Sequence, residues 1–293
     1  MSYEPPSYGA QPTTEPEGIP VCPRHPDRVS YVRCQRCGRP TCGECQRPAA
    51  VGIQCVDCVN EAQRAMPVQR TAFGGKVQAG GRPIVTYAII AITALTFLLQ
   101  FAVPGLQREL LYAGILTGSE PWRMLTAALL HSQGMIFHIL FNMYLLYAIG
   151  GMLEPLLGRA RFLALYILSA IGGSVAVLWL EDPRVAVIGA SGAVFGLFGA
   201  LLIIMRQRRV NYTGILVTVA INLVLGFIPG FNISWQAHVG GLIVGLAMGA
   251  IFAYTPAGPR RATLQWVGIA VVVAALLVLT YLGWIMLPSR YLG

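Results

Sequence analysis

Apolar residues dominate the chain from residue 84 onward, in long blocks separated by short polar intervals. A membrane-spanning helix needs about 20 consecutive apolar residues. The longest polar interval, 104–133, is expected to be a loop. The pattern predicts seven spans, at about 84–103, 135–153, 162–180, 188–205, 213–228, 235–254 and 264–287.

The pattern is different before residue 84. Residues 1–20 are polar, with prolines, glutamates and tyrosines but no apolar core, so we expect a disordered tail and not a signal peptide. Residues 60–83 contain glycines and small or polar residues without an apolar period, which predicts a linker.

Composition agrees with a membrane protein. The chain is 55% hydrophobic and 11% charged, with a mean hydropathy of +0.62, whereas a soluble domain has about 25% charged residues. The net charge of +9 comes almost entirely from arginine, since Lys76 is the single lysine. These arginines are spread among loops and the cysteine-rich N-terminal segment, which disfavours nucleic acid as a partner.

The arginines also predict an orientation. Positive residues concentrate in cytoplasmic loops, so we expect a multi-pass protein of the cell membrane with a cytoplasmic N-terminus and, after seven spans, an outer C-terminus. The loops assigned to the inner side contain Arg159, Arg161, Arg206, Arg208, Arg209, Arg260 and Arg261, and the outer segments contain Arg108, Arg123, Arg184 and Arg290.

All seven cysteines lie between residues 22 and 58, in pairs that indicate metal and not disulfides. With one histidine they make four ligand-x-x-ligand elements: Cys22/His25, Cys34/Cys37, Cys42/Cys45 and Cys55/Cys58. Eight ligands suit two tetrahedral structural Zn²⁺ sites, with no open position for catalysis.

The short spacers favour an interleaved pairing, with the first and third elements on one ion and the second and fourth on the other. Sequential pairing is the alternative. Residues 21–59 resemble a B-box-type zinc finger, which implies a protein partner for this module. Free thiolates require a reducing compartment, which agrees with a cytoplasmic N-terminus.

Four polar residues in the apolar region are candidates for chemistry. Ser191 lies between glycines about three residues into the fourth predicted span, and His238 lies at the same depth in the sixth. His138 and Asn142 are four residues apart in the second span and share one face. Because polar groups in membranes usually face the bundle interior, we predict that the four meet.

Each residue also has a purely structural interpretation. A serine can bond to its own helix backbone, and histidine or asparagine can join two helices. Small residues let helices approach closely, and we expect close contact between the fourth and sixth spans. The glycines concerned are Gly192, Gly196, Gly199, Gly241, Gly245 and Gly249.

Together the four residues favour nucleophilic catalysis. His238 would accept the proton of Ser191 and later protonate the leaving amine. The Ser191 backbone N–H, His138 and Asn142 would stabilise the oxyanion. No acidic residue follows Asp182, so we predict a Ser–His dyad whose base is oriented by packing against Phe195. No cofactor is expected for catalysis.

These motifs resemble the rhomboid family of intramembrane serine proteases. Residues 189–196 are similar to its Gly-x-Ser-Gly motif, Ala237-His238 with Gly241 to its base motif, His138 to Asn142 to its His-x-x-x-Asn element, and Trp122-Arg123 to its first-loop motif. The likeness covers residues 84–255. It implies six core helices around a water-filled cavity and cleavage of transmembrane substrates entering from the lipid.

The resemblance completes the expected architecture: an all-α polytopic membrane protein with a six-helix core over 84–255. Residues 256–293 would add a loop and a seventh helix, as in the six-plus-one variant of the family. His131 precedes His138 by seven residues, a longer gap than is usual in the family, and its role is left open.

Two other functions compete with a serine endopeptidase. A catalytically silent relative that binds transmembrane clients would normally have lost Ser191 or His238. A zinc-responsive transporter would need several acidic or histidine ligands deep in the spans, and after Asp182 the chain has His238 alone. The intact pair therefore favours the endopeptidase, with the zinc module used for docking or regulation.

Overall fold

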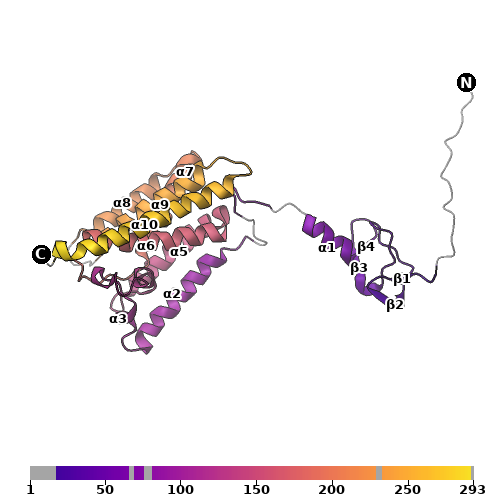
Figure 1. Cartoon of the computed structure of the whole chain (residues 1–293), viewed down its shortest axis with the longest axis horizontal. Helices are drawn as coiled ribbons and strands as arrows, with labels where there is room; N and C mark the ends of the chain where they lie inside the picture. The colour runs from indigo at the N-terminus through magenta and orange to yellow at the C-terminus, as the bar shows by residue number, and fades with distance from the viewer. Residues whose placement is uncertain (1–17, 66–68, 76–80, 229–232, 292–293) are drawn as a thin grey trace, which may run out of the picture. The chain divides into compact units, whose positions relative to one another are not determined.

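The computed structural model describes residues 18–65, 69–75, 81–228 and 233–291, so nearly all of the predicted tail lies outside the described residues. The chain divides into two compact units, Met1–Val68 and Gln69–Gly293. Figure 1 shows both units.

The N-terminal unit contains two small hairpins and one helix. Strand β1 (Val21–Cys22) pairs antiparallel with β2 (His25–Val29), and β3 (Gln46–Pro48) pairs with β4 (Ile53–Cys55). A single 3-10 turn, η1 (Gly43–Cys45), precedes β3, and helix α1 (Val56–Ala65) follows β4. In its described part the buried clusters consist of cysteines alone. The unit thus has little apolar core of its own to stabilise it.

The second unit is helical, and a helix lies at each of the seven predicted spans. These are α2 (Ile84–Ala102), α5 (Ile136–Leu157), α6 (Arg159–Leu180), α7 (Ser191–Gln207), α8 (Thr213–Leu225), α9 (Trp235–Tyr254) and α10 (Arg261–Tyr291). In the part of the chain that is described, five are long and apolar enough to cross a membrane, whereas α7 and α8 are apolar but shorter. The predicted polytopic membrane fold is confirmed.

The long loop between α2 and α5 is folded into short helices: α3 (Leu106–Leu110), η2 (Gly114–Leu116), α4 (Arg123–Thr126) and η3 (Ala127–Leu129). Arg123 holds this loop together. Its buried guanidinium pairs with Glu120 at 2.6 Å and Glu109 at 3.4 Å, and it donates to the carbonyl oxygen of Leu111. The arginine of the Trp122-Arg123 motif therefore orders the loop between α2 and α5.

Helices α7 and α9 touch through their backbones. A Cβ placed on Gly241 would lie 1.9 Å from the carbonyl oxygen of Gly192, and one on Gly245 would lie 2.0 Å from that of Gly196. This contact was predicted from the glycine spacing. Helix α6 joins it in the same way, because a Cβ on Gly240 would lie 2.3 Å from the oxygen of Gly172.

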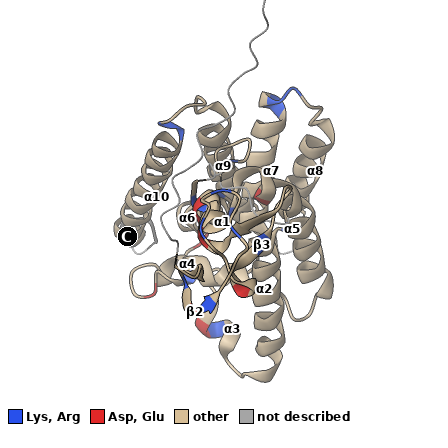
Figure 2. Ribbon diagram, turned by 90° about the vertical axis from the view of Figure 1, so that its right-hand side faces the viewer, with Lys and Arg blue, Asp and Glu red and all other residues tan. Residues whose placement is uncertain are grey.

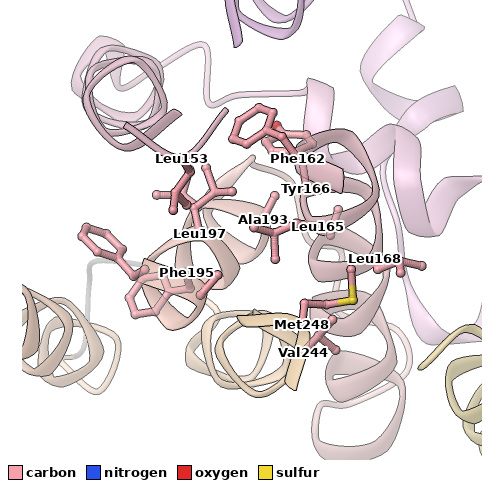
Figure 3. Close-up of a cluster of buried hydrophobic side chains, with 14 of the residues drawn as sticks. Leu153, Phe162, Leu165, Tyr166, Leu168, Ala193, Phe195, Leu197, Val244 and Met248 are labelled. Carbon is pink, nitrogen blue, oxygen red and sulfur yellow. The ribbon is translucent and has the colours of Figure 1, made fainter. Parts of the chain in front are cut away.

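Larger apolar side chains fill the remaining interior of the helical unit. Leu165 and Tyr166 of α6, Leu197 of α7 and Met248 of α9 are all buried and belong to one hydrophobic cluster, which Figure 3 shows in part. The three helices that meet at the glycines are thus also joined by an ordinary packed core.

Adding one methyl group at Gly241 should destabilise the bundle. For Gly241→Ala we expect a loss of about 1–3 kcal/mol in the free energy of unfolding, because the backbones of α7 and α9 must separate. Gly151→Ala is the matched control, since nothing lies within 4 Å of its Cβ position, and it should be neutral or stabilising by up to about 1 kcal/mol. Unfolding in mixed detergent micelles measures both, and equal effects would contradict the packing argument.

Polar contacts fix both ends of α2. The buried carboxylate of Glu154, near the end of α5, accepts from the backbone N–H groups of Val85 at 3.0 Å and Thr86 at 2.8 Å. It caps the first turn of α2, whose N–H groups have no partner within the helix. Near the other end of α2, buried Gln100 contacts the loop that leads into α5.

Candidate active site and metal centres

Ser191 is the first residue of α7. The prediction placed it about three residues inside its span, but the helix begins later because Gly189 has a φ of 125°, a conformation that favours glycine. The preceding segment is tied to the loop: Gly189 N–H donates to the Ala127 carbonyl at 2.9 Å, and Val187 N–H to that of Tyr112 at 2.8 Å. The ordered loop therefore fixes where the serine lies.

The backbone N–H groups at the start of α7 are not capped by a side chain. The N-cap residue is Ala190. The first N–H groups of a helix have no partner within the helix, and the helix dipole places partial positive charge there. Ser191 thus lies where a developing negative charge would be stabilised.

His138 faces this point. A Cβ placed on Gly189 would lie 2.9 Å from His138 Nε2 and 3.8 Å from Ser191 Oγ, so both atoms border the same small space. The backbone N–H of Ser132 donates to His138 Nδ1 at 3.3 Å. A neutral imidazole that accepts at Nδ1 has its hydrogen on Nε2, so His138 offers an N–H toward Ser191.

Asn142 lies one turn further along α5, is buried, and donates from Nδ2 to the His138 carbonyl at 2.8 Å. An amide group has a second hydrogen to donate. The described contacts of Asn142 do not include Ser191.

The ring of His238 stacks on that of Phe195, with centroids 4.1 Å apart and planes 13° apart. The packing of the two rings is confirmed. The Nδ1 atom of His238 is buried without a hydrogen-bond partner in the described residues. In those residues no hydrogen bond joins the Ser191 hydroxyl to His238.

Two contacts fix the start of α9, which positions His238. The Ser234 side chain accepts from the Ala237 N–H at 3.3 Å, and Gln236 donates to Glu181 at 2.6 Å. This contact between Gln236 and Glu181, the residue that follows α6, was not predicted. The signal available in the sequence was Gln236 itself, a polar residue two positions before the candidate base His238.

His131 is fully buried, and its ring lies 4.9 Å from that of His138. Gln100 of α2 holds its backbone, donating to the His131 carbonyl at 2.9 Å and accepting from its N–H at 3.1 Å. Gln100 was missed as well, although an uncharged polar residue near the end of an apolar span is visible in the sequence. His131 therefore packs against His138, with its backbone held by α2.

The N-terminal unit brings its eight ligands together in two groups. Cys22, His25, Cys42 and Cys45 form one, and Cys34, Cys37, Cys55 and Cys58 form the other, with ligand atoms within 4.8 Å of one another. This grouping is the interleaved one, with the first and third ligand pairs together and the second and fourth together.

The ligand distances fit tetrahedral zinc. A Zn–S bond of about 2.3 Å implies S···S distances of about 3.8 Å, and the Cys37 and Cys55 sulfurs are 3.8 Å apart. His25 uses Nδ1, which lies 3.2 Å from the Cys42 sulfur and 3.4 Å from the Cys45 sulfur. Both groups can hold a metal ion.

Neighbouring groups support the ligands. Arg39 Nε donates to the Cys37 sulfur at 3.3 Å, and this contact lowers the pKa of the Cys37 thiol, which favours the thiolate. The Cys55 N–H donates to the Cys34 sulfur at 3.1 Å. On the outer side of His25, Nε2 lies 3.8 Å from a Glu44 carboxylate oxygen, the kind of partner that orients a ligating histidine.

The helical unit thus defines a class: a polytopic membrane protein that gathers a serine and histidines at one end of a glycine-packed bundle. The model of the rhomboid domain family matches residues 118–255. The putative rhomboid protease YdcA of Bacillus subtilis is 33% identical over 177 residues, 57% of this chain and 86% of that protein. The chain belongs to the rhomboid family.

Other relatives are longer. Rhomboid protease GluP of Bacillus subtilis is 36% identical over 190 residues, 61% of this chain and 36% of that protein. RHOMBOID-like protein 4 of Arabidopsis thaliana is 36% identical over 149 residues, 48% of this chain and 36% of that protein. The chain thus spans about a third of the length of these two curated relatives.

Proposed function

We propose that the protein is an intramembrane serine endopeptidase that cleaves transmembrane segments of other membrane proteins. The observation that carries the proposal is Ser191 at the uncapped start of α7, with His138 Nε2 bordering the same space as its hydroxyl. An activated serine needs donors placed where negative charge develops. Two of the relatives are named as rhomboid proteases, one of them putative.

In the proposed reaction, Ser191 Oγ attacks the scissile carbonyl carbon while His238 accepts its proton. The oxyanion receives hydrogen bonds from the Ser191 N–H, from Nε2–H of His138 and from Asn142. His238 then protonates the leaving amine, and water hydrolyses the acyl-enzyme with His238 again as base. The free Nδ1 of His238 and its stacking on Phe195 support a dyad, since the ring is positioned without a carboxylate.

Charge supports the proposed orientation. The arginines at the C-terminal end of α7 and at the starts of α6 and α10 lie at the end of the bundle away from Ser191. We place this end of the bundle, together with the N-terminus, in the cytoplasm. Ser191 would then face the outer side, and the C-terminus would be outside.

We further propose that the N-terminal module, residues 21–59, is a B-box-like zinc finger with two structural Zn²⁺ ions. When bound, zinc would hold the two hairpins and the start of α1 together through the eight ligands. The module would serve docking or regulation through a protein partner and supply no group to the reaction. Residues 60–83 would link it to the core at 84–255, followed by the additional helix.

A fluorophosphonate probe tests the nucleophile without knowledge of the substrate. We expect covalent labelling of the detergent-solubilised wild type and none of Ser191→Ala. Ser119→Ala is the matched control, because this exposed loop serine donates only to the Leu116 carbonyl. Absence of labelling in a folded wild type would favour the silent, client-binding alternative. Labelling that persists in Ser191→Ala would show a different nucleophile.

A further inference from the structure

The end of the bundle opposite Ser191 contains an arginine cluster around a docked turn, Thr71–Gly75. The turn belongs to the segment expected to be a linker, yet Phe73 is only 3% exposed. A Cβ on Gly75 would lie 2.2 Å from the Leu157 carbonyl oxygen, so the backbone of the turn rests directly on the end of α5.

Arginines from separate elements converge on this turn. Arg261 of α10 donates to the Ala72 carbonyl at 2.9 Å, and Arg70 donates to the Gly74 carbonyl at 3.2 Å. The guanidinium carbon of Arg208, after α7, lies 5.0 Å from the centre of the Phe73 ring. Arg161 of α6 completes the cluster, since its Nη2 lies 3.7 Å from the Cβ position of Gly74.

The positive charge of this cluster is not balanced. Arg161 is 7% exposed, and its Nε donates to the neutral side chain of Gln265 at 2.8 Å. No ion pair joins these arginines to an acidic residue in the described ranges. Carbonyl and amide oxygens accept hydrogen bonds from the guanidinium groups but do not neutralise their positive charge. Buried charges are normally paired with an opposite charge.

An unused donor points to the same place. The Nε atom of Arg261 is buried and has no hydrogen-bond partner among the described residues. Helices α6 and α10 both begin here, and no side chain caps α6, so the positive end of its dipole adds to the field. Figure 2 shows the arginines at the α7–α8 connection and at the start of α10 together at one end of the bundle.

We propose that the arginine cluster, Arg70, Arg161, Arg208 and Arg261, binds a phosphate group carried by an anionic phospholipid. Guanidinium groups bind phosphate through paired, charge-assisted hydrogen bonds. The cluster lies where apolar helices begin and end, which is the level of the lipid headgroups, and basic sites between helices at that level bind anionic headgroups. The inference does not depend on the proposed protease activity.

Thermal unfolding of the full-length protein in a neutral detergent tests this site. Short-chain phosphatidylglycerol should raise the Tm by about 5 °C or more at saturation, and phosphatidylcholine with the same chains should not. Inorganic phosphate is the second probe. A shift with phosphate alone, lost in the variants below, would support the site but assign it to a free anion. No shift with either probe would overturn the proposal.

The variants separate a specific site from general adsorption. Arg261→Gln and Arg161→Gln should weaken the apparent affinity for phosphatidylglycerol by about tenfold or more, the effect of one lost charge-assisted hydrogen bond. Arg260→Gln is the matched control, since this neighbouring arginine is exposed and no hydrogen bond joins it to the turn in the described part of the chain. Equal affinity in the Arg260 and Arg261 variants would overturn the site. Arg261 is partly exposed, so its variant tests the site even if the buried Arg161 variant does not fold.

Discussion

Replacing His238 with alanine is expected to lower the rate constant for fluorophosphonate labelling of Ser191 by about 10²–10⁴-fold, the usual contribution of a general base. The hydroxyl of Ser191 would remain at the uncapped start of α7, with its oxyanion donors in place, but nothing would accept its proton. The time course of labelling measures the rate constant. Labelling of His238→Ala at the wild-type rate would contradict the dyad.

Substitutions at Phe195 test how the base is held. Phe195→Leu removes the ring that stacks on His238 at 4.1 Å, and we expect labelling to slow by about tenfold or more because a misplaced base is less effective. Phe195→Tyr keeps the ring and is the matched control, with labelling near the wild-type rate. Equal rates in the two variants would show that stacking does not orient His238.

Removing zinc should unfold the N-terminal module. Structural zinc sites contribute about 10–16 kcal/mol of folding free energy, and the module has buried cysteines in place of an apolar core. After chelation we expect rapid proteolysis within residues 18–65, while fluorophosphonate labelling of the helical unit persists. Loss of labelling in a helical unit that stays folded would make the module part of the catalytic unit.

A single ligand substitution gives the stoichiometry. Cys58→Ser leaves three ligands in its group, so zinc content measured by mass spectrometry should fall from about two ions per chain to about one. Arg47→Gln is the control, because this exposed arginine donates to carbonyl oxygens and not to a ligand. Full zinc content in Cys58→Ser would contradict the two-site assignment.

Much of this architecture follows from local patterns. The seven helices were predicted because an apolar block long enough to span a membrane can be recognised without knowledge of tertiary contacts. The interleaved metal groups followed from short spacers between ligand pairs. The contact of α7 with α9 followed from glycines repeated along one face, and the stacking of Phe195 on His238 from a spacing of one turn.

What sequence did not predict depends on contacts between distant segments. Nothing local in Gln100 shows that it holds the backbone of His131, or in Gln236 that it reaches Glu181. The docked turn at Thr71–Gly75 was predicted to be part of a linker. Its single phenylalanine among small residues makes no repeating apolar pattern that would indicate a packed segment. The sequence prediction began α7 at about residue 188, before its observed start at Ser191. Gly189 lies in an apolar run, and its backbone conformation, which ends that run as a helix, is not visible in the sequence.

Helix α8 has a consequence for the surrounding lipid. Its 13 residues span about 20 Å, whereas the hydrocarbon core of a bilayer is about 30 Å thick. Val219 is its one buried residue in the described structure, so most of the helix faces outward. Lipids relieve such hydrophobic mismatch by thinning locally, and any transmembrane helix beside α8 would meet water sooner along its length than it does in the open membrane.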